Sequence, residues 1–148
     1  MKSIVKSTLA AITIAAALGG ANASAQTAFG RVIAAQQNRV DIDQRGSGNG
    51  AAASQFGFGN STALAQRGSD NTAVLNQNGD DNYLHARQAG NRNTATATQN
   101  GNGNGLCLLQ LGNNLHLDVE QSGGHRGTVM QTANGTRTGR GFLPLFCR

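Results

Sequence analysis

The sequence predicts an all-β protein, a two-sheet, amyloid-like β-solenoid of about four to five 22-residue coils. Three observations predict this class. Glutamine recurs every eleven residues through the middle of the chain, large apolar residues are too few for an ordinary globular core, and asparagine and glutamine are abundant. Repetition at so short a period is typical of stacked folds in which each unit contacts only its neighbours.

The first 25 residues are expected to be a cleaved export signal. Lys2 and Lys6 form a basic start, Ser7–Leu18 is a short apolar run, and Ala23-Ser24-Ala25 is an A-x-A cleavage site. The apolar run is too short to span a bilayer, so no transmembrane segment is expected in the mature chain. The mature protein, residues 26–148, is therefore predicted to be secreted.

The composition of residues 26–148 argues against an ordinary globular protein, a disordered chain and a nucleic-acid-binding protein. Val, Ile, Leu and Phe supply only 23 of 123 residues, which is low for a packed core, yet the charge is too low for a typical disordered chain. Ten arginines against seven acidic residues give a mildly basic chain without a nucleic-acid footprint. The 15 asparagines and 12 glutamines make amide ladders the expected source of order.

The repeat unit is Q-x-G-x-x-N-x-ϕ-x-ϕ-x, where ϕ is small or apolar. Its first place is filled by Gln44, Gln55, Gln66, Gln77, Gln88, Gln99, Gln110 and Gln121. Two places later stand Gly46, Gly57, Gly68, Gly79, Gly90, Gly101, Gly112 and Gly123. The asparagine place is filled by Asn38, Asn49, Asn60, Asn71, Asn82, Asn93 and Asn104. An unbroken register of this length is a strong signal.

Each unit is expected to contain one strand and one turn. From each Asn to the next Gln the pattern alternates with a period of two, which is typical of a strand with one buried face. The four residues between Gln and Asn, such as those of 45–48, are rich in turn-forming Gly and Ser. The inward pairs are Val40/Ile42, Ala51/Ala53, Thr62/Leu64, Ala73/Leu75, Leu84/Ala86, Ala95/Ala97, Leu106/Leu108 and Leu117/Val119.

The inward pairs carry a second period. Through Ala97, bulky pairs alternate with alanine-richer ones, which predicts two strands per coil, one in each of two facing sheets. The last coil is bulky in both strands and is expected to be wider than the others, or the best packed.

Stacking also explains the amides. It places each Gln and Asn about 4.8 Å from its equivalent one coil away, where side-chain amides form ladders. No polar capping helix is predicted at either end, so each end should expose a strand edge that templates another copy. We expect a leader at 26–37, the solenoid at 38–131 and a tail at 132–148.

The repeat resembles that of the curlin family, the subunits of bacterial curli. The match to Q-x-G-x-x-N-x-A, closed by a further Gln, is complete in 44–55, 66–77 and 88–99. The resemblance covers roughly residues 38–131. It implies an extracellular, pilus-like amyloid fibre built from this chain and other curlin subunits, with roles in adhesion and biofilm. It further implies export through the periplasm and a dedicated outer-membrane machinery.

The last units depart from the family pattern. Leu115 and Arg126 stand in the Asn place, the spacing slips to ten at Gln131, and Ala133 replaces the turn Gly. In the family, a divergent basic last repeat is more typical of the minor, nucleating subunit than of the major one. The basic residues here are Arg126, Arg137, Arg140 and Arg148. The segment 26–37 also lacks a Gly-rich leader, so a minor or nucleator-like role is slightly favoured.

Catalytic, metal and cofactor sites are not expected. The paired carboxylates Asp41/Asp43 and Asp118/Glu120 lie three coils and one sheet apart, which does not suit acid–base chemistry on one substrate. They are interpreted as residues that slow premature stacking. His85, His116 and His125 lie on different units and lack the spacing of a metal site, so they are predicted to be solvated surface residues.

A monomeric secreted solenoid that binds a surface such as carbohydrate or ice is the main alternative. Such a surface would present one outward column of Thr in every coil. Thr94, Thr96 and Thr98 lie in one strand, but the stacked neighbours break the column with residues such as Val74 and Asp118. One Thr-rich strand is ordinary β-propensity.

The two cysteines, Cys107 and Cys147, leave three possibilities open. An exported chain makes a disulfide plausible, and a bridge within the chain would pin the apolar tail 141–148 against the solenoid near Leu109. An intermolecular bridge and two free thiols are the alternatives, and the sequence does not choose among them.

Overall fold

A computed structural model gives the structure of residues 11–17, 26–33, 38–140 and 147. The other positions of the expected export signal, including its cleavage site, lie outside these described residues. So do residues 34–37 of the expected leader and residues 141–146 and 148 of the tail.

The strands of the described residues form two sheets, which confirms the all-β, two-sheet prediction. The five-stranded sheet contains, in spatial order, β1 (Ala11–Ala17), β4 (Gly50–Phe56), β6 (Thr72–Asn78), β8 (Thr94–Asn100) and β10 (His116–Ser122). The seven-stranded sheet contains β12 (Gly135–Arg140), β11 (Arg126–Thr132), β9 (Gly105–Leu111), β7 (Tyr83–Ala89), β5 (Ser61–Arg67), β3 (Arg39–Gly46) and β2 (Gln26–Ile33).

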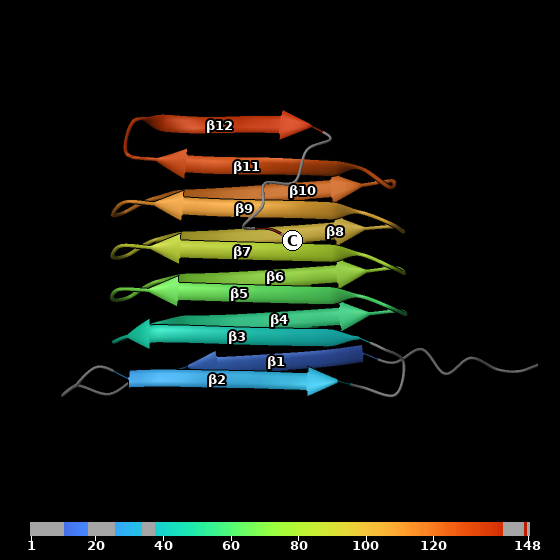
Figure 1. Cartoon of the computed structure of the whole chain (residues 1–148), viewed down its shortest axis with the longest axis horizontal. Coiled ribbons are helices and arrows are strands. Elements are labelled where there is room, and N and C mark those ends of the chain that lie inside the picture. Colours follow the sequence, from blue (N-terminus) through green and yellow to red (C-terminus); the bar gives the residue numbers. More distant parts are fainter. Residues whose placement is uncertain (1–10, 18–25, 34–37, 141–146, 148) are drawn as a thin grey trace, which may run out of the picture.

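From β3 to β11 the chain alternates between the two sheets and climbs as a solenoid (Figure 1). Neighbouring strands in this part are parallel and pair in register at a separation of 22 residues, so Gln44 lies opposite Gln66 and Gln55 opposite Gln77. The last step is shortened to 21 residues, because Gln131 lies opposite Gln110. The strands therefore make four and a half coils, within the predicted number.

The core lies between the sheets and is built from the predicted inward pairs. Thirteen of their sixteen side chains are no more than 4 % exposed, because each strand presents every second residue to the facing sheet. The exceptions are Ala51, Leu117 and Val119. Leu117 and Val119 belong to β10, which has no neighbour on its outer side, so the last coil is not the best packed.

Tight turns set the height of each coil. Gly68 has φ +115°, and a Cβ built there would lie 2.0 Å from the carbonyl oxygen of Gly90, one coil further on. A side chain therefore cannot fit between these stacked turns, and at Gly68 the third place of the repeat is restricted to glycine by both backbone conformation and space.

The ends of the solenoid differ from the expected bare edges. Antiparallel strands cover both ends of the seven-stranded sheet: β2 pairs with β3, and β12 pairs with β11. In the five-stranded sheet, β1 pairs antiparallel with β4, whereas β10 forms an open edge. The alternating pattern of the repeats does not extend into these strands, so sequence periodicity did not predict them. No helix among the described residues is long and apolar enough to cross a membrane.

Candidate functional site

Glutamine side chains form a continuous hydrogen-bonded ladder within each sheet. In the seven-stranded sheet the Nε2 of each Gln donates to the Oε1 of the Gln one coil further on, over 2.6–2.9 Å. Its rungs are Gln44, Gln66, Gln88, Gln110 and Gln131. In the five-stranded sheet the same bonds measure 2.8–2.9 Å, with rungs Gln55, Gln77, Gln99 and Gln121. The interior rungs are buried, so each depends on its neighbours for hydrogen bonding.

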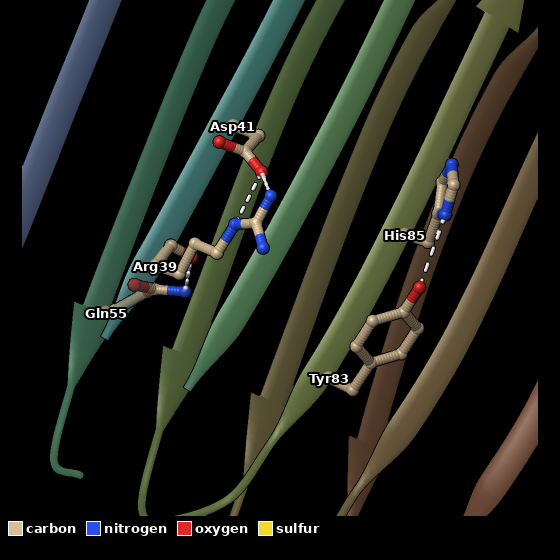
Figure 2. A network of polar contacts seen from close by, with 5 residues as sticks. All are labelled: Arg39, Asp41, Gln55, Tyr83 and His85. Atoms are coloured by element: carbon tan, nitrogen blue, oxygen red, sulfur yellow. Dashed lines mark hydrogen bonds and ion pairs between the residues drawn. The ribbon is translucent and has the colours of Figure 1, made fainter. Parts of the chain in front are cut away.

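The same glutamines also join the two sheets. Gln55 Nε2 donates to the backbone carbonyl of Arg39 on the facing sheet, 2.9 Å away (Figure 2). Gln66 and Gln88 make the equivalent bonds to Gly50 and Thr72, at 3.1 and 3.0 Å. Each of these three glutamines therefore holds together two stacked coils and two facing sheets.

The asparagine column works differently from the glutamine ladders. The Nδ2 of five asparagines donates to the carbonyl of a turn glycine 19 residues later, over 2.7–2.9 Å. These five are Asn38, Asn49, Asn60, Asn71 and Asn93. The Oδ1 of Asn38, Asn49, Asn60, Asn71 and Asn82 accepts from the backbone N–H of the asparagine one coil further on, 22 residues later, over 2.8–3.1 Å. The asparagines thus fasten the turns of successive coils.

The turn glycines lie between these two columns. All eight predicted turn glycines have positive φ, from +79° at Gly123 to +144° at Gly112. Where the repeat loses its asparagine, backbone groups close the column: Leu115 N–H donates to Asn93 Oδ1, and His125 N–H to Asn104 Oδ1, both at 3.1 Å. The structure therefore brings together in adjacent columns all three classes of residue that the repeat singled out.

A further ladder in the turns was missed by the sequence analysis. Oxygens of Asp80, Asn91, Asn102 and Asn113 accept from the backbone N–H of the residue 22 positions earlier, over 2.8–2.9 Å. These residues lie three places after a repeat glutamine, and their own period of eleven was the signal that could have revealed them.

The two ends of the glutamine ladders are not equivalent. At the N-terminal end, Oε1 of Gln44 and Oε1 of Gln55 are buried without a hydrogen-bond partner. An unsatisfied buried polar group costs about 1–3 kcal/mol. At the C-terminal end, Gln121 Nε2 donates to the backbone carbonyl of His125 and Gln131 Nε2 to that of His116, both at 2.8 Å. The N-terminal end is therefore the one that lacks donors.

A disulfide anchors the end of the chain to the outer face of the seven-stranded sheet. The structure joins Cys107 of β9 to Cys147, with 5.9 Å between their Cα atoms, and both residues are buried. Tyr83 donates its hydroxyl hydrogen to the Cys147 carbonyl, 2.7 Å away, and the hydroxyl oxygen lies 3.3 Å from His85 Nδ1 (Figure 2). Burial raises the pKa of Tyr83.

His85 differs from the predicted solvated histidines. It is half-buried in this corner, whereas His116 and His125 are exposed. Burial lowers the pKa of His85, and the neighbouring positive charge of Arg87 lowers it further. The structure thus places one titratable group against the anchored end of the chain.

The outward charged groups do not form a reactive cluster. Asp41 pairs with Arg39 (Figure 2) and Asp43 with Arg45, the latter at 3.2 Å. Asp118 and Glu120 lie on β10, on the other sheet. Among the described residues, no group of three or more His, Cys, Asp or Glu side chains could hold a metal ion.

Comparison with protein families gives one match. The curlin associated repeat matches four overlapping stretches, residues 36–66, 59–90, 79–106 and 90–123. These stretches together span β3 to β10 and end before β11. Comparisons with curated proteins and with solved structures give no match.

Proposed function

The chain belongs to the curlin family, and from this membership we propose that it builds an extracellular amyloid fibre by templated end-to-end stacking. It is a curli-like structural subunit. The observation that carries the proposal is the pair of continuous glutamine ladders, in which every coil repeats the donor and the acceptor of the coil before it. A second copy offers the same rung, so the fold can continue across a junction between copies.

In this mechanism no residue is catalytic. Main-chain bonds at the strand edges supply the attraction between copies, and the Gln and Asn columns fix the register, because a slip by one residue would turn every buried amide outward. The turn glycines keep the coils one strand spacing apart, as the close approach of Gly68 to Gly90 illustrates.

We favour a minor, nucleator-like role over that of a major subunit. The last repeats diverge from the rest, with Leu115 and Arg126 in the asparagine place, and the family match ends before β11. Export through an outer-membrane curli machinery, and roles in adhesion and biofilm matrix, follow from the family as part of this proposal.

A capped monomeric solenoid is the second candidate, and one observation favours it. The antiparallel strands β2 and β12 cover both ends of the seven-stranded sheet, as capping strands of a soluble protein would. Its outward surface, however, lacks a repeated column: Thr94 lies between Thr72 and His116, and Thr96 between Val74 and Asp118. A regular carbohydrate- or ice-binding face has no counterpart there.

The deciding experiment is fibre formation by purified residues 26–148, diluted from denaturant and followed by thioflavin fluorescence and fibre diffraction. Growth with reflections near about 4.7 and 10 Å supports the fibre subunit. Seeding of a partner curlin at substoichiometric amounts then separates a nucleator from a major subunit. A soluble β-rich monomer that never polymerises would favour the capped solenoid instead.

A further inference from the structure

The hydrogen bonds of both glutamine ladders all run in one direction. In every rung-to-rung bond the Nε2 of the earlier glutamine donates to the Oε1 of the later one, without exception in either sheet. The N-terminal end of each ladder is therefore an acceptor end, and the C-terminal end is a donor end. A second copy placed head to tail presents a donor end to an acceptor end.

The acceptor end is formed by β3 and β4. Gln44 Oε1 and Gln55 Oε1 are 0 % exposed and have no donor. The positions opposite them in register hold Ala28 in β2 and Ile12 in β1, and neither residue type has a side-chain amide. Strands β2 and β1 pair with β3 and β4, yet neither oxygen has a donor, and β1 belongs to the segment expected to be removed on export. The end is therefore complete only when two glutamine donors arrive one coil below.

The two sheets contain unequal numbers of solenoid strands, and this difference limits which strands of a second copy can supply those donors. The solenoid has five strands in the seven-stranded sheet, β3 to β11, but only four in the other sheet, β4 to β10. If the next copy stacked its β3 on β11, one strand place between β10 and its β4 would stay empty. If it stacked on β9 and β10 instead, both sheets would continue without a gap.

The β11–β12 hairpin occupies the place on β9 that this second arrangement requires. It is the least regular part of the solenoid: the family match ends at residue 123, the glutamine spacing slips to ten, and Arg126 stands in the asparagine place. Of its strand β11 only Val129 is buried. These features distinguish the hairpin from the four regular coils below it.

We propose that the β11–β12 hairpin is a displaceable cap, that β3 to β10 form the stacking unit, and that its occupant is a second copy of this chain. When the hairpin leaves β9, strands β9 and β10 of one copy pair in parallel with β3 and β4 of the next. Gln110 then donates to Gln44 and Gln121 to Gln55, so both free oxygens gain a donor at once. This inference rests on the proposed fibre-forming function and adds to it the two contacting surfaces.

The side chains of the two ends are complementary in this junction. Leu106 and Leu108 meet Val40 and Ile42 of the next copy in the same register as in the coils below, so the apolar core continues. On β10, Leu117, which is 8 % exposed, and the partly buried Val119 meet the small residues Ala51 and Ala53, which would cover what remains exposed. Strands β2 and β1, where present, leave β3 and β4 in the same step, because a parallel neighbour needs those edges.

Cysteine trapping tests the junction directly. In the proposed stack the outward residue Leu111 lies opposite Arg45 of the next copy, at a strand spacing that a disulfide spans. Fibres grown from a mixture of Arg45→Cys and Leu111→Cys chains are oxidised and analysed by non-reducing gels and peptide mapping. We expect a cross-link between positions 45 and 111. The control mixture pairs Arg45→Cys with Thr132→Cys, because Thr132 is the β11 residue of the same column.

The outcomes separate the inference from the proposed function. A 45–132 cross-link would mean that β11 receives the next copy and would overturn the cap. A 45–45 cross-link, or normal fibres that give no cross-link at 45–111, would overturn the head-to-tail contact itself. Absence of any fibre from the unsubstituted chain would instead count against the proposed function.

A locked cap gives a second test. The double variant Leu111→Cys/Thr132→Cys ties β11 to β9, whereas Arg67→Cys/Ala89→Cys makes the same cross-link two rungs earlier, inside the stacking unit. When oxidised, the first variant should elongate seeds at least about tenfold more slowly than the second. A tenfold ratio of rates corresponds to a difference of about 1.4 kcal/mol in barrier height. Equal elongation by the two variants would overturn the cap.

Discussion

Tyr83 donates a hydrogen bond to the backbone carbonyl of Cys147, which lies 64 residues further along the chain and 2.7 Å away. Together with the Cys107–Cys147 disulfide, this bond fixes the end of the chain on strands β7 and β9, two coils of the seven-stranded sheet. Cys147, which lies outside the repeat pattern, is thereby held on a surface built of repeats by a hydroxyl and a disulfide.

Tyr83→Phe should loosen that attachment without disturbing the coils. The substitution removes a single hydrogen bond, worth about 1 kcal/mol, and keeps the ring. We expect the disulfide to be reduced several-fold faster at a fixed concentration of dithiothreitol, because release of the chain end exposes it. Thiol trapping over time measures the rate, and an unchanged rate would show that the tyrosine does not hold the end.

Acid should weaken the same corner. Because burial lowers the pKa of His85, the unfolded chain binds more protons than the folded chain between that lowered pKa and about pH 6.5. The stability that neutral His85 contributes is complete above about pH 6.5 and is lost as the pH falls through this window. Denaturant unfolding of freshly diluted monomer at several pH values measures the slope.

Two histidine variants make the pH prediction specific. His85→Gln should flatten the slope in that window, because the substituted side chain does not titrate. His116→Gln, at an exposed position on β10, is the matched control and should retain the wild-type dependence. If both variants behave alike, the acid sensitivity does not arise at His85.

Two glycines with positive φ should respond differently to alanine. At Gly68 (φ +115°) an added Cβ would lie 2.0 Å from the Gly90 carbonyl oxygen, whereas at Gly103 (φ +69°) it would meet nothing within 4 Å. Gly103→Ala should cost about 1–2 kcal/mol for the left-handed backbone alone. Gly68→Ala must also push two coils apart, so it should cost several kcal/mol, or prevent folding. Circular dichroism and unfolding curves compare them, and equal costs would refute the close approach.

Substitutions at interior rungs of the ladders should lower the stability of the monomer, whereas substitutions at terminal rungs should slow fibre elongation. Gln77 bonds to Gln55, Thr62 and Gln99 in the buried interior, at 2.8 Å in each case. Gln77→Leu leaves these partners unsatisfied and should lower stability by about 1–3 kcal/mol for each unpaired group. Unfolding of the monomer measures this loss.

Substitutions of the terminal glutamines are expected to slow fibre elongation. Gln44→Leu and Gln121→Leu alter the rungs that meet an incoming copy, so they should slow seeded elongation more than Gln77→Leu does, once the rates are compared for equal amounts of folded monomer. Seeded thioflavin kinetics provide the comparison. Equal slowing by all three variants would contradict templating at the ends.

Much of the fold could be predicted because the repeat is strict. A period of eleven, with inward residues at alternate places, defines strand, turn and buried face together, and Leu75, Leu84 and Leu108 are each 0 % exposed as expected. The predicted amide ladder of the asparagine column is present in part, because Asn71, Asn82 and Asn104 each donate to the asparagine one coil earlier at 3.0 Å. The prediction did not include the bonds that these side chains also make to turn backbone, such as that of Asn60 to the Gly79 carbonyl at 2.7 Å. Residue type indicates that an amide needs partners, but not which ones it takes.

The sequence by itself determined the coil: its period, its inward face, its glycine turns and its buried amides, because each unit meets only a copy of the same pattern one strand spacing away. Only the tertiary structure decided what happens where that pattern stops. Strands β2 and β12 turn antiparallel over the ends, Cys107 joins Cys147, and Gln44 and Gln55 are left with free oxygens. These contacts join segments outside the repeat to its edges, and no periodicity can specify a contact that occurs once.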